Sequence, residues 1–145
     1  LANGVPIGAM GCTDEVAQGF SPGAHACTFG GNPLSCAAAI ATLETLTSPG
    51  FLECANEVGD SFMGQLKALA ADHPQIVEVR GKGLMIGVEF KEAVAPLITR
   101  MIESGIICGP AGPNVLRFLP PLIVTEEQMD RVVSVLVACL GELGW

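Results

Sequence analysis

The segment Thr28–Pro33 has a composition suited to binding a phosphate group. It reads Thr-Phe-Gly-Gly-Asn-Pro, and Asn32 followed by Pro33 is typical of the start of a helix. Unpaired N–H groups and the positive end of the helix dipole attract anions at such a position, and the Thr28 hydroxyl offers a further donor. The residues alone favour a simpler interpretation, a capped helix in which the two glycines ease a turn.

Arg117 is a single charged residue within an apolar stretch. The stretch Asn114–Leu122 reads Asn-Val-Leu-Arg-Phe-Leu-Pro-Pro-Leu and predicts a short strand over Val115–Phe118. The planar guanidinium is suited to bidentate binding of a carboxylate. Spacing alone favours an arginine on an edge strand that extends its charged end into water. Both interpretations stay open at the level of the residues.

Other catalytic patterns are weak or missing in the sequence. His25 and His73 have no Cys or His neighbour at ligand spacing, so no metal site is expected. No Gly-x-Ser-x-Gly motif occurs, which disfavours a serine hydrolase. Arg80–Gly83 reads Arg-Gly-Lys-Gly, but it lacks the length and the ending of a phosphate-binding P-loop. We predict a hairpin turn there.

The composition indicates an acidic chain with much buried apolar surface. Seven Lys and Arg against fifteen Asp and Glu give a net charge of −8 without a basic cluster, which disfavours a nucleic-acid partner. Apolar runs end well before the ~20 residues of a membrane span, so no membrane partner is expected. The six cysteines are scattered without a Cys-x-x-Cys pair and indicate a reducing, cytoplasmic compartment.

Hydrophobic periodicity predicts the elements that would position these residues. The predicted helices are Leu34–Leu46, Phe51–Ala71, Val94–Ser104 and a last helix that starts after Thr125. The predicted strands are Ile76–Val79, Leu84–Phe90, Ile106–Cys108 and Val115–Phe118, with a loop over 109–113. The second half of the sequence is therefore expected to form an α+β layer.

Four stretches, in this order, resemble class III aminotransferases of the acetylornithine/ornithine type. They are Gly4–Ala9 (Gly-Val-Pro-Ile-Gly-Ala), Thr28–Pro33, Arg80–Gly87 and Arg117–Leu122. The resemblance covers all 145 residues, which match the last part of a typical family member. It implies an α/β parent with the type I fold of pyridoxal-phosphate (PLP) transferases. Residues 1–32 would then be a remnant of the large PLP-binding domain, 33–47 a linking helix and 48–145 the small C-terminal α+β domain.

The resemblance also implies a cofactor and roles for single residues. Thr28 matches the threonine that reaches the PLP phosphate of the partner subunit in a homodimer, and Arg117 matches the arginine that faces a substrate carboxylate. In the family the Gly-x-Pro-Ile-Gly-Ala phrase follows closely on the Schiff-base lysine, which by this alignment falls just before Leu1. We therefore assign no catalytic residue, and we expect this chain alone to be inactive and not to bind PLP.

The implied reaction transfers the amino group of N-acetylornithine to 2-oxoglutarate in arginine biosynthesis. Ornithine, 4-aminobutyrate and succinyl-diaminopimelate stay open as alternative donors, and family aminomutases or decarboxylases as alternative reactions. A different class of function is a non-catalytic module that binds a partner or oligomerises. The absence of an initiator Met, together with a start directly after the expected lysine, favours a truncated chain over such a module.

Overall fold

The computed structural model describes residues 1–145, which form two compact units. The first unit comprises Leu1–Phe51 and the second Leu52–Trp145. The division falls at the first residue of helix α3 (Phe51–Asp72), just after the Ser-Pro-Gly sequence that ends the preceding helix.

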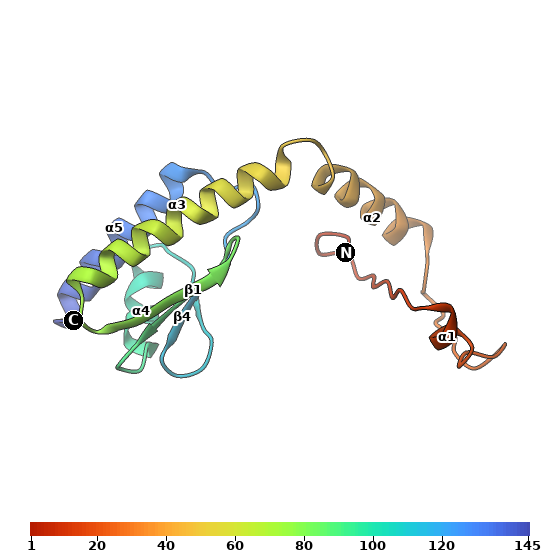
Figure 1. The fold of residues 1–145 in the computed structure, drawn as a ribbon, viewed down its shortest axis with the longest axis horizontal. Helices are drawn as coiled ribbons and strands as arrows, with labels where there is room; N and C mark the ends of the chain where they lie inside the picture. Colours follow the sequence, from red (N-terminus) through yellow and green to blue (C-terminus); the bar gives the residue numbers. More distant parts are fainter. The chain divides into compact units, whose positions relative to one another are not determined.

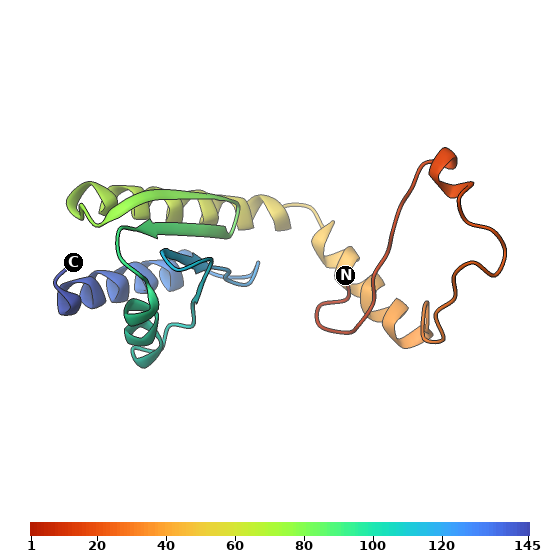
Figure 2. The same ribbon diagram turned by 90° about the horizontal axis from the view of Figure 1, so that it is seen from below.

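The first unit contains two helices joined by a long loop. Helix α1 (Asp14–Ala17) is a single turn, and α2 (Pro33–Leu46) is the main helix. Figure 2 shows the loop between them as an extended segment without regular structure. Helix α2 starts as predicted, with Pro33 in its first turn and the Asn32 side chain accepting the Ser35 N–H at 3.0 Å.

The second unit is an α/β sandwich built on a four-stranded antiparallel sheet of order β1-β2-β4-β3. Its strands are β1 (Ile76–Lys82), β2 (Met85–Phe90), β3 (Gly109–Pro110) and β4 (Val115–Phe118). Its helices are α3, α4 (Ala95–Glu103) and α5 (Glu126–Leu143). Figure 1 shows α3 and α5 running along the same side of the sheet. The predicted α+β layer is confirmed.

The core lies between one face of this sheet and the helices. Side chains of a strand alternate between two faces, and in β2 Ile86, Val88 and Phe90 are each 1% exposed or less. They pack with residues of α3, α4 and α5 in a single cluster. Phe62 of α3 meets Phe118 of β4 edge to face, with ring centroids 5.3 Å apart. The opposite face of the sheet carries no helix of this unit.

The hairpin between β1 and β2 is tighter than the sequence suggested. The turn was expected at Arg80–Gly83, but β1 continues through Lys82, which pairs with Met85. Only Gly83 and Leu84 form the loop, and Gly83 has φ +53°, as two-residue hairpin loops require. The expected turn was therefore wrong for its first three residues, because their pairing with β2 outweighs the turn tendency of glycine.

The short strand before β4 also differs from expectation. A strand was predicted at Ile106–Cys108 and a loop at 109–113, whereas β3 is Gly109–Pro110. Ile106 is instead tied to the end of α4, where its N–H donates to the Met101 carbonyl at 2.8 Å. Pro110 is tolerated in β3 because this strand lies at the sheet edge, where a missing N–H costs no ladder bond.

Helix α5 begins with a capping box. The Thr125 hydroxyl accepts the Gln128 N–H at 3.3 Å, and the Gln128 side chain accepts the Thr125 N–H at 3.0 Å. We expect Thr125→Ala to lower the free energy of unfolding by about 1 kcal/mol in urea denaturation, because it removes the cap. Thr125→Ser should stay within a few tenths of the wild type, and an equal loss in both variants would contradict the assignment.

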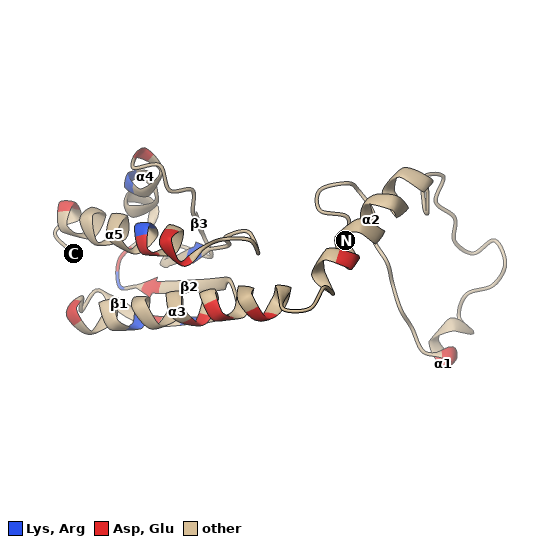
Figure 3. Ribbon diagram, turned by 90° about the horizontal axis from the view of Figure 1, so that it is seen from above, with Lys and Arg blue, Asp and Glu red and all other residues tan.

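Charged residues are distributed unevenly along the chain. All seven lysines and arginines belong to the second unit, while acidic residues occur on helices of both units (Figure 3). No helix in the structure has both the length and the apolar composition that a bilayer-spanning helix needs.

Candidate functional site

Thr28 lies in the turn that leads into α2, within the first unit. Its side chain is exposed and its hydroxyl forms no hydrogen bond within the chain. The N–H groups of Phe29 and Gly31 also donate to no other group of the chain. Gly31 has φ +67°, a conformation that glycine adopts without strain. The turn thus presents a hydroxyl and free N–H groups ahead of a helix N-terminus, an arrangement that suits an anion.

Ser35 links two of the stretches that carry the family resemblance. It lies in the first turn of α2 and is 5% exposed. Its hydroxyl donates to the Pro6 carbonyl at 3.2 Å and accepts the Asn32 side-chain N–H at 3.0 Å. The segment Gly4–Ala9 is therefore anchored to the start of α2. This role was not predicted, because a serine in the first turn of a helix is common and the contact spans 29 positions.

Arg117 lies on β4, an inner strand of the sheet. The interpretation as an edge-strand arginine is wrong, because β4 is paired with β2 on one side and with β3 on the other. Leu116 and Phe118 point into the core, so Arg117 points to the opposite, open face and is exposed. Its neighbours across the two pairings are Gly87 and Gly109, which have no side chains to cover it.

The charges around Arg117 leave its guanidinium available. Arg80 lies in the same row of the sheet, beyond Gly87. It pairs with Glu89 and, at 2.6 Å, with Glu78, and these two hydrogen bonds raise the pKa of Arg80. Arg117 takes part in no ion pair or side-chain hydrogen bond. It can therefore accept a carboxylate as a ligand without giving up an internal partner.

The other residue types with catalytic potential are not gathered at either place. Lys67, Lys82 and Lys91 all lie in the second unit, on α3, at the end of β1 and just after β2. No group of three or more His, Cys, Asp or Glu could hold a metal ion. Thr28 belongs to the first unit and Arg117 to the second.

The thiols differ in their surroundings. Burial raises the pKa of Cys108 from 9.0 to about 11, with a smaller contribution from Cys139. Cys54 on α3 is exposed. Because the thiolate is the nucleophile, we expect iodoacetamide at pH 8 to alkylate Cys108 at least about tenfold more slowly than Cys54. Peptide mass spectrometry over time would measure both rates, and equal rates would contradict the burial of Cys108.

The same shift predicts how stability depends on pH. The folded chain holds the Cys108 proton more tightly than the unfolded chain, because its folded pKa of about 11 is above 9.0. This contribution to stability is fully present below pH 9 and is lost as the pH rises toward 11.

The sequence as a whole matches a known family. The model of the class III aminotransferases matches residues 1–140. Acetylornithine aminotransferase of Caldanaerobacter subterraneus subsp. tengcongensis is 44% identical over 144 residues, which are 99% of this chain and 36% of that protein. Ornithine aminotransferase 2 of Staphylococcus aureus is 46% identical over 135 residues, 92% of this chain and 34% of that protein. The chain thus spans about a third of the length of these relatives.

Solved structures of aminotransferases also align with most of this chain. The crystal structure of acetylornithine aminotransferase from Elizabethkingia anophelis aligns with a TM-score of 0.79 and 32% identity, covering 88% of this chain and 34% of that one. Ornithine aminotransferase from Toxoplasma gondii aligns with a TM-score of 0.81 and 31% identity, covering 90% and 32%. Since the family model matches nearly the whole sequence, this chain belongs to the class III aminotransferase family.

Proposed function

We propose that this chain is the C-terminal part of an aminotransferase that moves the amino group of N-acetylornithine to 2-oxoglutarate in arginine biosynthesis. The observation that carries the proposal is the 44% identity with an acetylornithine aminotransferase along almost the whole chain. The chemistry of the residues supports it. Both 2-oxoglutarate and N-acetylornithine carry carboxylates, and the chain offers an unpaired guanidinium on an open sheet face.

Arg117 would bind and orient a substrate carboxylate. Its fork of N–H donors matches the two carboxylate oxygens. The pairing of β4 with a strand on each side fixes the position of the Arg117 backbone. Fixing one end of the substrate places the amino or keto carbon at a defined distance from the reacting group. Gly109, which pairs with Arg117, has open space where a Cβ would stand, and this leaves room for a ligand to lie against the sheet on that side.

PLP, when bound, supplies an electron sink for cleavage of bonds at the carbon that bears the amino group. Of the residues in this chain, Thr28 and the N–H groups of Phe29 and Gly31 would hold its phosphate, across the interface of a homodimer. No lysine lies in the first unit, and none of the lysines of this chain stands just ahead of the Gly4–Ala9 stretch, where the family has its Schiff-base lysine. We therefore propose that the 145-residue chain alone is inactive. The six free cysteines support a reducing, cytoplasmic compartment for the whole enzyme.

Ornithine is the second candidate donor. The ornithine aminotransferase 2 of Staphylococcus aureus is 46% identical over 135 residues, a match similar to that of the acetylornithine enzyme. N-acetylornithine and ornithine differ in whether the α-amino group carries an acetyl group.

Borohydride trapping tests the proposal. PLP is added to this chain and to a longer protein that includes the preceding lysine, both samples are reduced with borohydride, and the modified lysine is located by mass spectrometry. We expect a stoichiometric adduct only in the longer protein, just ahead of Leu1. A single specific adduct on Lys67, Lys82 or Lys91 would mean that this chain binds PLP by itself. No specific adduct in either protein would favour a non-catalytic module.

A further inference from the structure

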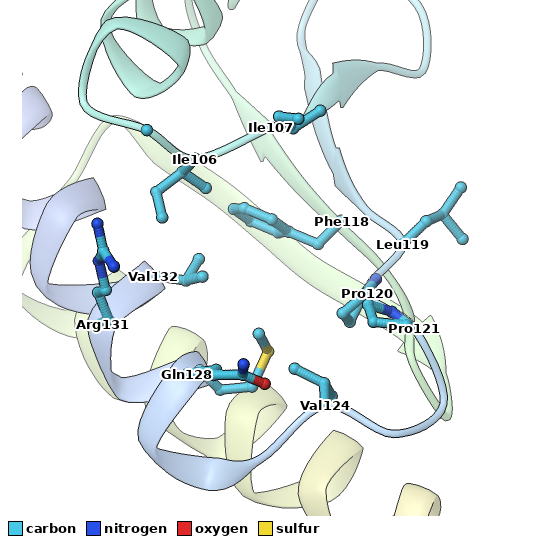
Figure 4. A pocket seen from close by; sticks show the side chains of 12 residues that line it. Ile106, Ile107, Phe118, Leu119, Pro120, Pro121, Val124, Gln128, Arg131 and Val132 are labelled. Carbon is cyan, nitrogen blue, oxygen red and sulfur yellow. The ribbon is translucent and has the colours of Figure 1, made fainter.

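A cavity of about 470 Å³ lies within the second unit, between the end of β4 and the first turns of α5. The residues Gly105–Ile107, which follow α4, form another side of it. Figure 4 shows Ile106 and Phe118 on one side of the cavity, with Gln128 and Val124 facing them. The volume lies within the range of about 300–1,000 Å³ that is usual for small-molecule sites.

The lining of this cavity is apolar apart from two side chains. Phe118, Met129 and Val132 line its inner part and are 4%, 5% and 8% exposed. Gln128 and Arg131, both on α5, are the only polar side chains in the lining. The Oε1 atom of Gln128 is already used, because it accepts the Thr125 N–H at 3.0 Å. The side-chain groups left for a ligand are therefore N–H donors.

Arg131 supplies a positive charge without a partner. It forms no ion pair or side-chain hydrogen bond, whereas Arg80 and Arg100 are paired with glutamates. The neighbouring Asp130 accepts a hydrogen bond from Gln65 at 2.6 Å. The Arg131 Nη2 atom lies 3.8 Å from the position that a Cβ of Gly105 would take, which places the guanidinium beside the loop that lines the cavity. The lack of a side chain at Gly105 leaves this approach open.

This cavity is separate from the carboxylate site proposed at Arg117. Successive side chains of β4 point to opposite faces of the sheet, so Phe118 reaches the cavity while Arg117 points to the open face. Arg117 does not line the cavity. Arg117 and Arg131 thus lie at different surfaces of the same unit.

We infer that this cavity binds a small monocarboxylate with an apolar body. The body would lie against Phe118, Met129 and Val132, and the carboxylate would pair with the Arg131 guanidinium. A dicarboxylate is disfavoured, because no second cation lines the cavity. A neutral apolar molecule would leave Arg131 without a partner and would gain only from burial.

Methyl NMR of this chain with 3-phenylpropanoate tests the inference. The aromatic ring of this probe shifts the signals of nearby methyl groups, and Ile106, Met129 and Val132 report on the cavity. We expect saturable shifts of these methyls with a Kd of about 1 mM, a value suited to a ligand of this size. The neutral 3-phenylpropanamide should bind about fivefold more weakly, the upper end for an exposed ion pair. Acetate, which lacks the apolar body, should not shift these signals.

Two matched variants test whether Arg131 supplies the positive charge that binds the carboxylate. Arg131→Gln should bind 3-phenylpropanoate about as weakly as wild type binds the amide, while Arg100→Gln should bind it like wild type. Equal affinity of wild type for the acid and the amide would overturn the inference without relying on any variant. The absence of shifts at these methyls would also overturn it. So would shifts that depend on the concentration of the chain and not on the concentration of the probe, because they would indicate that a second copy of the chain covers the cavity.

Discussion

Replacing Arg117 with Gln in the complete enzyme is expected to lower kcat/KM for 2-oxoglutarate about 100-fold. The substitution keeps a polar side chain on β4 but removes the charge and the fork geometry that suit a carboxylate. A hydrogen bond to a charged group is worth about 1.5–3 kcal/mol, and about 2.7 kcal/mol corresponds to this factor. Steady-state measurement of glutamate formation at varied 2-oxoglutarate provides the test.

Arg100→Gln is the matched control for this prediction. Arg100 lies on α4 and pairs with Glu103 at 3.2 Å and Glu142 at 3.8 Å, all three exposed. Exposed pairs of this kind are worth little, so the control should change kcat/KM less than about twofold. If Arg117→Gln retained activity within a factor of about three, Arg117 would not be the carboxylate ligand.

Gly81→Ala is expected to lower the free energy of unfolding of the second unit by about 3 kcal/mol. A Cβ at Gly81 would lie 2.2 Å from the Met85 carbonyl oxygen and 2.9 Å from the Ile86 Cα. Both are backbone atoms of β2, so no side chain can rotate away and the hairpin itself must open. Urea denaturation followed by circular dichroism measures the loss.

Gly64→Ala provides the opposite result in the same unit. Gly64 lies on α3 and has open space where a Cβ would stand. Alanine there should raise stability by about 0.5–1 kcal/mol, because glycine loses more conformational freedom in a helix. A Gly81→Ala protein as stable as wild type would show that β1 and β2 are not paired as closely as described.

Helix starts were the part of the fold that local chemistry predicted best. Asn32 with Pro33, and Thr125 with Gln128, each form a cap within four consecutive residues, so no knowledge of the rest of the fold is needed. The strand Val115–Phe118 was also predicted with its observed limits. Its place inside the sheet was not predicted, because the strand order depends on pairing with β2 and β3. Strand β2 is distant in the sequence, and β3 has only two residues and no strand pattern.

The errors occurred where pairing between strands decides the structure. Glycine and proline are typical of turns, yet Gly81 and Pro110 both lie in strands. Gly81 is needed because the β2 backbone comes too close for a side chain, and Pro110 occupies an edge. Such requirements come from the partner strand and leave no periodic pattern in the sequence.

The candidate site was predictable in residue type more than in arrangement. An arginine in an apolar strand and a threonine ahead of a capped helix could be selected from the sequence. The glycines that flank Arg117 across the sheet, and the contact from Ser35 to Pro6, became visible only with the register and the fold. The roles of Thr28 and Arg117 stay predictions.

The most direct test of the proposed function is to assay the complete enzyme and this chain in parallel. Each is incubated with PLP, 2-oxoglutarate and one donor, either N-acetylornithine, ornithine or 4-aminobutyrate, and glutamate is quantified. We predict that the complete enzyme forms glutamate fastest with N-acetylornithine and that the 145-residue chain forms none. Absence of glutamate with every donor, or its formation by the chain alone, would contradict the account.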